Sequence, residues 1–511
     1  MNKKMLLLGL AVAGVLVMLA AAPSALAGDP ACDTRDNNNF NKLLECVTLD
    51  GVREHQAALQ AIADANNGIR TSGTPGYDAS VDYVVERMTD AGYVVTVQPF
   101  QFNTFIDLGP STLEQTAPGA ATYTEGVDYD EMSQSEPGNV TASVTAVDLQ
   151  LGLGNTSTSG CEAADFAGFP AGNIALIQRG TCTFELKAEN AAAAGASGVV
   201  IFNQGNTPAR TGLIGGTVGN GYTGGIPVFE ATYARGVEWS GTAGLVLHMF
   251  ANVFRGEATT YNVLAETRDG NPNNVVMAGA HLDSVNAGPG IQDNGSGSAA
   301  ILEVAEQMAK VKPRNKVRFA WWGAEESGLV GSTYYVNSLS QAERDKIALY
   351  LNFDMVGSPN HVFFIYDGDD SDGVGAGPGP SGSAQIEKTF EKYFNMVGQP
   401  FKGTDFSGRS DYGPFIAVGI PSGGLFTGAE GIKTAEEAAV WGGTAGQAYD
   451  PCYHLACDTY ANNNDQALDV NSDAVSYATL QYAMNTEEIN GVKGKGNFKP
   501  DMDYLGDLLA R

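Results

Sequence analysis

The chain has few basic residues and few histidines for its length. Its 511 residues include 29 Lys and Arg against 58 Asp and Glu, and its formal net charge is −29. An acidic surface of this kind repels nucleic acid and anionic membranes, so we expect neither as a partner. Because there are only five histidines, a pair that falls within one group of loops carries more weight than it would in a histidine-rich chain.

Cysteine pairs with the spacing of zinc-binding thiols are also missing. The six cysteines contain no CxxC motif, which argues against a thiolate metal site and favours three disulfides in an exported chain. Sequence alone leaves the pairing open. The simplest pattern joins neighbours: Cys32 with Cys46, Cys161 with Cys182, and Cys452 with Cys457.

Long apolar runs are confined to the N-terminus. The run over residues 5–22 follows two lysines and precedes the small-residue signal Ala25-Leu26-Ala27, which is the arrangement of a secretory signal peptide over residues 1–27. An uncleaved membrane anchor is the alternative, because the run is nearly long enough to span a bilayer. We expect a secreted protein, extracellular or periplasmic, that does not contact a membrane after cleavage.

The remaining length is too great for one ordinary domain. Residues 28–50 form an Asn-rich lead segment, and residues 491–511 form a polar tail. Residues 106–254 are rich in Gly, Thr and Ser with short apolar runs, which indicates a β-rich module inserted into a larger α/β domain. That domain would comprise residues 51–105 and 255–490.

Short apolar stretches recur in the second part of the larger domain. Four of them are typical of strands buried on both faces of a mostly parallel sheet: residues 275–279, 317–322, 348–353 and 362–366. Between the first two, the pattern predicts a helix with Ser298 as its N-cap and Pro313 beyond its end. We therefore expect an α/β fold with a mostly parallel mixed sheet flanked by helices.

Acidic residues and histidines follow three of these strands. The strand ends and the loops after them contain His281, Asp283, Glu325, Glu326 and Asp354. Because the carboxyl ends of strands form the binding crevice of an open α/β sheet, we expect these side chains to lie close together. Any one of them alone would be read as an ordinary turn or helix-start residue.

Two further residues complete the set. Asp293 lies in a Gly-rich loop after the first strand, and His454 lies late in the chain. Imidazole nitrogens and carboxylate oxygens are donors that zinc accepts. A shared carboxylate would hold two ions about 3.5–4 Å apart, the spacing of co-catalytic hydrolases.

The strings around these residues resemble those of the secreted bacterial two-zinc aminopeptidases, which share their catalytic fold with glutamate carboxypeptidase. The resemblance runs from Tyr261 to about Asp473 and includes the stretches at 408–415 and 423–430. It implies a zinc exopeptidase fold. It also implies the metal ligands: His281 and Asp354 for one Zn²⁺, Glu326 and His454 for the other, and Asp293 as the bridge.

The resemblance implies roles for four more side chains. Asp283 would orient His281, and Glu325 would be the general base on the bridging water. Tyr453 would stabilise the tetrahedral oxyanion. Arg409 would lie in the substrate pocket, and a surface salt bridge is its alternative interpretation.

The implied activity is hydrolysis of the N-terminal peptide bond of peptides and proteins, with a preference for apolar N-terminal residues, by a monomer. Residues 173–203 resemble a protease-associated domain, which is a lid beside the cleft in related exopeptidases; a passive insert is the alternative. Asp469 and Asp473 resemble a calcium pair of close relatives, and acids placed at a helix start are the alternative.

Three other functions are compatible with this scaffold. A carboxypeptidase would need a basic cluster for the terminal carboxylate of its substrate, and only Arg409 is visible. A glutaminyl cyclase would bind one zinc. A non-catalytic binding protein would have lost metal ligands, whereas this chain has all five and Glu325.

Overall fold

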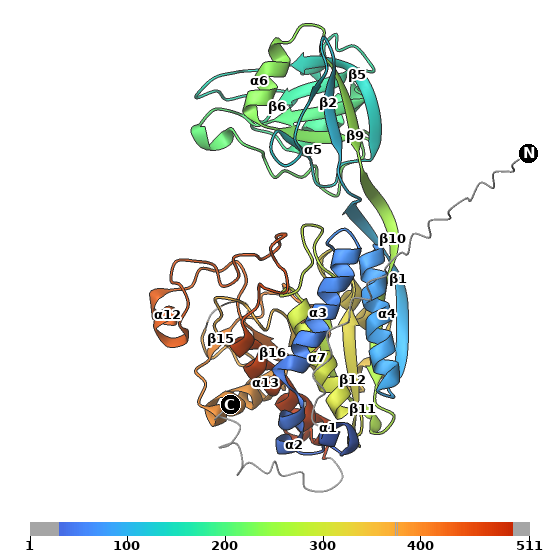
Figure 1. Ribbon diagram of the computed structural model, residues 1–511, viewed down its shortest axis with the longest axis vertical. Helices are drawn as coiled ribbons and strands as arrows, with labels where there is room; N and C mark the ends of the chain where they lie inside the picture. The colour runs from blue at the N-terminus through green and yellow to red at the C-terminus, as the bar shows by residue number, and fades with distance from the viewer. Residues whose placement is uncertain (1–29, 374, 376, 494–511) are drawn as a thin grey trace, which may run out of the picture.

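The computed structural model describes residues 30–373, 375 and 377–493 (Figure 1). The predicted signal peptide over residues 1–27 and the part of the predicted tail beyond residue 493 lie outside the described residues. The described residues form two bodies, each built on an eight-stranded sheet. In Figure 1 the smaller body stands above the larger one, and the strands β1 and β10 join them.

The joining strands form a long antiparallel ribbon. β1 (Val94–Asp107) pairs with β10 (Val253–Glu266) over its whole length, from Val94 opposite Glu266 to Asp107 opposite Val253. The smaller body is therefore an insertion between the two strands. All its sheet strands come from the intervening residues: β2 (Thr112–Ala117), β3 (Ala121–Thr122), β4 (Tyr129–Glu131), β5 (Gly138–Val147), β6 (Ile174–Gln178), β7 (Gly198–Phe202), β8 (Val228–Ala231) and β9 (Val246–Ala251).

The larger sheet has the strand order β1-β10-β12-β11-β13-β16-β14-β15. Its centre consists of four parallel strands: β11 (Asn271–His281), β12 (Asn315–Trp322), β13 (Ile347–Phe353) and β16 (Ser422–Phe426). β10 is antiparallel to β12, and β14 (Phe364–Tyr366) is antiparallel to β16 and parallel to β15 (Lys402–Thr404). The predicted α/β class with a mostly parallel mixed sheet is confirmed.

Helices cover both faces of this sheet, which explains why its central strands are continuously apolar. Alternate residues of one strand enter different cores: Trp321 packs with one set of helices and Trp322 with the other. The first set is α3 (Leu49–Ala65), α4 (Pro75–Asp90), α7 (Gly295–Met308), α10 (Ser383–Val397) and α13 (Asp465–Met484). The second set is α8 (Val330–Ser338) and α11 (Tyr412–Ala417).

Short helices complete the larger body: α1 (Pro30–Thr34), α2 (Phe40–Cys46), α9 (Gln341–Arg344), α12 (Ala435–Trp441) and α14 (Glu487–Asn490). The smaller body adds α5 (Phe184–Ala193) and α6 (Tyr233–Gly241), with 3-10 turns at Ala163–Phe166 and Pro208–Arg210. Its parallel strands β6, β7 and β8 are buried along their whole length. Among the described residues, no helix is both long and apolar enough to cross a membrane.

The start of α7 differs from the prediction. The helix begins at Gly295 and its N-cap is Asn294, whose side chain accepts the Gly297 N–H, so the assignment of the cap to Ser298 was wrong. The sequence looked like a loop because glycine has a low helix propensity. Packing overrides that propensity, since a Cβ on Gly297 would lie 2.1 Å from the Phe353 carbonyl oxygen.

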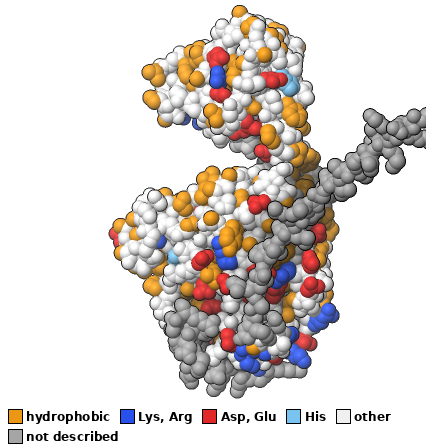
Figure 2. Space-filling model, in the orientation of Figure 1, with side chains coloured by type: hydrophobic (Ala, Val, Ile, Leu, Met, Phe, Trp, Pro, Cys, Tyr) orange, Lys and Arg blue, Asp and Glu red, His pale blue; other side chains and the backbone are white. Residues whose placement is uncertain are grey.

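Three disulfides join cysteines that are neighbours along the chain: Cys32–Cys46, Cys161–Cys182 and Cys452–Cys457. The third closes a short loop around His454. In the larger body the parallel strands run in the same direction as β1. Their carboxyl ends therefore point toward the inserted body, and Figure 2 shows a hollow between the two bodies.

Candidate metal centre

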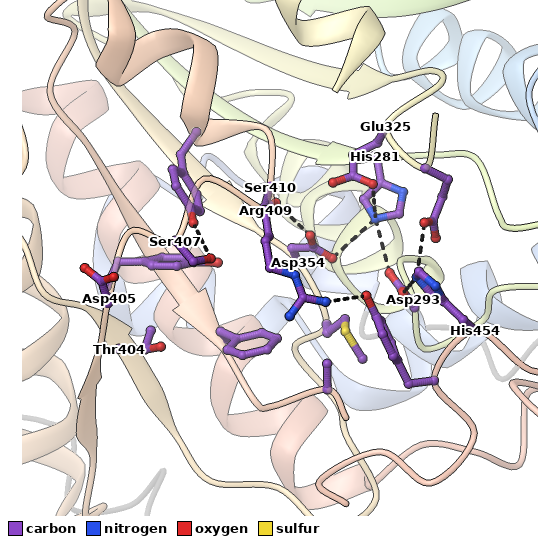
Figure 3. A pocket seen from close by; sticks show the side chains of 17 residues that line it. His281, Asp293, Glu325, Asp354, Thr404, Asp405, Ser407, Arg409, Ser410 and His454 are labelled. Carbon is purple, nitrogen blue, oxygen red and sulfur yellow. Dashed lines mark hydrogen bonds and ion pairs between the residues drawn. The ribbon is translucent and has the colours of Figure 1, made fainter. Parts of the chain in front are cut away.

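The carboxyl ends of the central strands bring the predicted metal ligands into one cavity. His281 is the last residue of β11, and Asp354 directly follows β13. Glu325 and Glu326 lie in the turn after β12, and Asp293 lies just before α7. His454 comes from the disulfide-closed loop and completes the group in Figure 3.

The two oxygens of Asp293 face different histidines. Oδ1 lies 3.2 Å from His281 Nε2, and Oδ2 lies 3.3 Å from His454 Nε2. His281 Nε2 is also 3.3 Å from Asp354 Oδ1, and His454 Nε2 is 3.1 Å from Glu326 Oε2. Two ligand atoms about 2.1 Å from a tetrahedral zinc ion lie roughly 3.4 Å apart, so each group has the spacing of atoms that share one ion.

Two carboxylate oxygens of the centre are buried without a partner. Asp354 Oδ1 and Glu326 Oε1 are inaccessible to solvent and accept no hydrogen bond from the described residues. A buried, unsatisfied polar atom costs about 1–3 kcal/mol, and more if it is charged. A bound cation removes that cost. The residues present therefore fit a metal centre with nitrogen and oxygen donors.

The electrostatics of the group indicate the same. Burial alone would lower the pKa of His454, but Asp293 and Glu326 raise it to about 10. Burial raises the pKa of Glu326 to about 7. Burial would also raise the pKa of Asp293, yet hydrogen bonds from His281 and His454 hold it below its usual range. Divalent cations would take the place of the protons that these groups otherwise share.

Asp283 contacts His281 through its main chain and the turn after β12 through its side chain. His281 Nδ1 lies 3.1 Å from the main-chain oxygen of Asp283, whereas the nearer carboxylate oxygen is 3.6 Å away. The Asp283 carboxylate accepts the backbone N–H groups of Glu325 and Glu326, at 3.2 and 3.3 Å. Asp283 thus fixes the turn after β12 against the end of β11.

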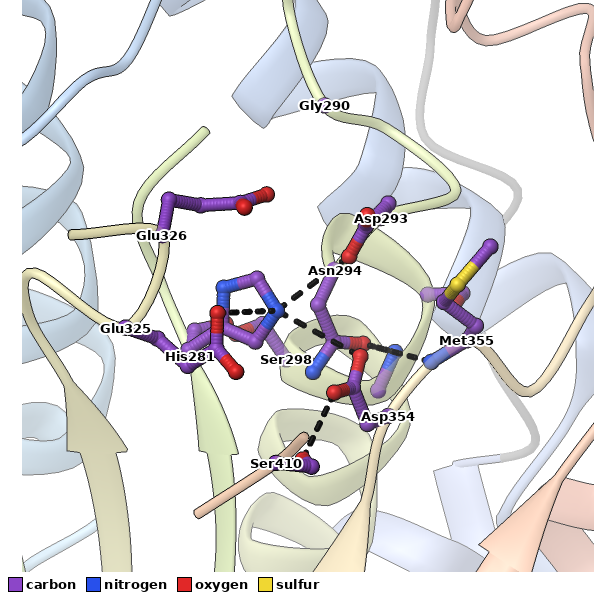
Figure 4. Close-up of polar contacts among 12 residues, drawn as sticks. His281, Gly290, Asp293, Asn294, Ser298, Glu325, Glu326, Asp354, Met355 and Ser410 are labelled. Atoms are coloured by element: carbon purple, nitrogen blue, oxygen red, sulfur yellow. Dashed lines mark hydrogen bonds and ion pairs between the residues drawn. The ribbon is translucent and has the colours of Figure 1, made fainter. Parts of the chain in front are cut away.

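Three residues that the sequence analysis did not single out hold the ligands in place. Ser410 Oγ donates to Asp354 Oδ2 at 2.6 Å, as Figure 4 shows. Asp458 accepts the N–H groups of Gln292 and Asp293, at 2.8 and 3.0 Å. Asn294 Nδ2 donates to the Phe353 carbonyl, which ties α7 to β13. Ser410 belongs to one of the quoted family stretches, but no spacing signal pointed to Asp458.

Glu325 lies beside the ligands without belonging to either group of donors. Its nearer carboxylate oxygen is 3.9 Å from His281 Nε2, and the side chain is buried at the cavity wall. Burial raises its pKa well above the usual value. A carboxyl group in this position can accept a proton from a molecule in the cavity and release it again.

Arg409 and Tyr453 line the opening of the cavity. Arg409 Nη2 donates to the Tyr453 hydroxyl at 3.1 Å, and Nη1 forms an ion pair with Glu430 at 2.7 Å. The Arg409 side chain is 59% exposed. Arg409 therefore lines the cavity, as the resemblance implies, and also forms the surface salt bridge that was its alternative interpretation. The rest of the wall includes the apolar or aromatic side chains of Met355, Tyr366, Tyr412, Phe426 and Ala429.

The chain matches known families in two segments. Residues 262–479 match peptidase family M28, and residues 140–239 match the PA domain. The first segment contains every residue of the metal centre, and the second lies within the inserted body.

Relatives extend the match over most of the chain. An aminopeptidase of Pseudomonas aeruginosa is 59% identical over 448 residues, which are 88% of this chain and 83% of the relative. Leucine aminopeptidase 2 of Arthroderma otae is 40% identical over 89% of this chain and 87% of its own. Among solved structures, a zinc aminopeptidase from Bacillus subtilis is 25% identical with a TM-score of 0.59, over 85% of this chain and 94% of its own. This chain therefore belongs to peptidase family M28, with a PA domain inserted into the peptidase domain.

Proposed function

We propose that this chain is a secreted aminopeptidase that binds two zinc ions at the centre between β11, β12 and β13. His281 and Asp354 would hold one ion, Glu326 and His454 the other, and Asp293 would bridge them. The observation that carries this proposal is the position of Asp293, whose two oxygens face two histidines of different groups at 3.2 and 3.3 Å. Membership of the M28 family and the zinc aminopeptidase among the similar structures support it.

When bound, two zinc ions lower the pKa of a shared water and polarise the scissile carbonyl. Glu325 would accept a proton from the attacking water and pass it to the leaving amine. The Tyr453 hydroxyl would donate a hydrogen bond to the developing oxyanion. Asp283 would keep Glu325 in place through the backbone N–H of the turn after β12.

Selection of the N-terminus would follow from charge and shape. The cavity is lined by five carboxylates as well as its two histidines, and carboxylates attract the α-ammonium group of a free N-terminus. The apolar wall around Met355, Tyr366 and Phe426 would accept the first side chain of the substrate. An apolar preference agrees with the name of the fungal relative, a leucine aminopeptidase.

The other parts of the chain would support this activity. The peptidase domain would comprise residues 51–105 and 255–490. Residues 106–254 would form a lid beside the cleft that holds the metal centre. The disulfides agree with a destination outside the cytoplasm. Asp469 and Asp473 lie about one turn apart on α13 and would be ligands of a Ca²⁺ ion. We propose a monomer.

The test uses the purified chain without its signal peptide, a Leu-initiated peptide and the N-acetylated form of the same peptide. We expect free leucine from the unblocked peptide alone, loss of activity with a zinc chelator, and recovery with added Zn²⁺. Cleavage of both peptides would contradict recognition of the α-amine and point to a carboxypeptidase or an endopeptidase. Cleavage of neither, together with one bound zinc and cyclisation of an N-terminal glutamine, would identify a glutaminyl cyclase instead.

A further inference from the structure

A second group of a histidine and two glutamates lies on the helical side of the sheet. His55 belongs to α3, and Glu303 and Glu306 belong to α7. The three side chains offer donor atoms within 4.8 Å of one another. Glu303 lies ten residues after Asp293, about 15 Å along α7, so this group shares no residue with the centre at the start of that helix. Neither the family resemblance nor a pattern in the sequence had indicated this group.

His55 is a buried histidine with one nitrogen unaccounted for. The side chain is 1% exposed, and its Nδ1 lies 2.7 Å from the Tyr83 hydroxyl. Its Nε2 has no hydrogen-bond partner. That nitrogen points to the two carboxylates, at 3.6 Å from Glu303 Oε2 and 3.8 Å from Glu306 Oε2. These separations are too long for hydrogen bonds.

A hydrogen-bonded ion pair does not account for the arrangement, because Nε2 lies beyond hydrogen-bonding distance of both carboxylates. Burial lowers the pKa of His55 to about 4, so the imidazole is neutral at pH 7. Burial raises the pKa of Glu303 to about 7, so its carboxylate is poorly stabilised there. If Nδ1–H donates to Tyr83, the lone pair of Nε2 faces the two carboxylate oxygens. That is the environment of a metal-binding imidazole, whose other nitrogen donates to a neighbour.

The surroundings provide space and charge for a cation. A Cβ on Gly51 would lie 2.4 Å from Glu303 Oε1, so the glycine makes room for this carboxylate. Arg87 binds both oxygens of Glu306 at 2.5 and 2.6 Å and forms a longer ion pair with Glu54 at 3.5 Å. Glu303 forms no ion pair with a lysine or arginine among the described residues, so a cation bound there would supply its counter-charge. A neighbouring cavity is lined by Arg87 and by Glu306, one of the three residues of the group.

We propose that His55, Glu303 and Glu306 form a third metal site, which binds a divalent transition metal such as Zn²⁺ or Co²⁺. Three protein ligands with nitrogen and oxygen donors and one water would complete a tetrahedral set. The ion would link α3 to α7 and so brace the helix whose other end is preceded by Asp293.

The first test counts metal ions in the mature full-length chain after equilibration with Zn²⁺ and removal of loosely bound ions. We expect three ions per chain for the wild type and two for His55→Gln, with kcat for the Leu-initiated peptide unchanged. His248→Gln is the matched control, because His248 also faces a glutamate, Glu114, at 3.1 Å, but in the inserted body; it should retain three. An unchanged count in His55→Gln would overturn the proposal.

A second test measures metal binding at the third site in a chain whose proposed catalytic centre has been disrupted. The double variant His281→Ala/His454→Ala should retain one ion, and Zn²⁺ should still raise its thermal unfolding midpoint. Adding His55→Gln or the isosteric Glu303→Gln should abolish both the ion and the shift. A folded double variant that binds no ion would overturn the third site, whereas a double variant with as many ions as the wild type would overturn the catalytic centre instead.

Discussion

Both sheets of this protein bury polar side chains near the ends of parallel strands, and two residues from each differ in how fully they are hydrogen-bonded. In the inserted body, Glu230 of β8 accepts three backbone N–H groups, at 2.7–2.9 Å. Gln178 of β6 donates to two carbonyl oxygens and accepts one N–H. In the peptidase domain, Asp354 and Glu326 each keep a buried oxygen without a partner.

The difference separates structural polar groups from functional ones. Residue type and position at the strand end are similar in the two sheets. What differs is whether every polar atom of the side chain has a hydrogen-bond partner. Folding favours such partners for buried polar atoms. An unpartnered atom supports a ligand where it also faces other donor atoms, as Asp354 Oδ1 and Glu326 Oε1 do at the metal centre and His55 Nε2 does beside Glu303 and Glu306.

The largest expected effect comes from Glu325→Gln, which removes the proposed proton acceptor and leaves the proposed metal ligands intact. We expect kcat to fall about 1000-fold, within the usual range for a general base. Bound zinc should be unchanged. A variant with near-normal kcat would show that another group moves the proton, and loss of zinc would make Glu325 a ligand.

In the inserted body the matching experiment is Glu230→Ala. It leaves the N–H groups of Ile214, Gly215 and Gly216 without their acceptor, so we expect a loss of about 3 kcal/mol or more in the free energy of unfolding of this body. Chemical denaturation followed by circular dichroism measures it. Zinc content and kcat on a dipeptide substrate should not change. A fall in zinc content with unchanged stability would show that Glu230 supports metal binding rather than the fold of the inserted body.

Two histidines within the larger body differ in what sets their pKa. Burial, with a smaller contribution from Lys433, lowers the pKa of His361 to about 4, whereas carboxylates raise that of His454. A depressed folded-state pKa gives stability that is complete above pH 6.5 and is lost as the pH falls toward 4, by about 3 kcal/mol.

We therefore expect His361→Gln to lose less stability than the wild type between pH 7 and pH 4. Urea unfolding of both proteins in the presence of a chelator measures this difference without a contribution from bound metal. Parallel losses in the two proteins would show that His361 does not titrate in this way.

A smaller effect is expected for Ser410→Ala. The variant removes the hydrogen bond to Asp354 Oδ2 and retains all five ligands. Loss of such a supporting contact typically weakens metal binding 10- to 100-fold, roughly. Competition with a chromophoric chelator measures it. Ser240→Ala, on an exposed helix end of the inserted body, is the control and should bind zinc like the wild type.

Local patterns in the sequence predicted the central strands and the residues at their ends. Continuous apolar runs identify strands that are covered on both sides, and parallel strands bring their carboxyl ends together, which is why His281 and Asp354 could be grouped. Asp458 could not be predicted, because it contacts Gln292 across a sequence separation of 166 residues. The start of α7 was missed because tight packing at Gly297, rather than helix propensity, places it.

The central claim is tested most directly by anomalous X-ray scattering at the zinc edge, using crystals of the mature full-length chain. At this centre we expect one peak among His281, Asp293 and Asp354 and a second among Asp293, Glu326 and His454, about 3.5–4 Å apart as in other two-metal hydrolases. A single peak, or none at a centre that is otherwise ordered as described, would contradict the two-zinc account.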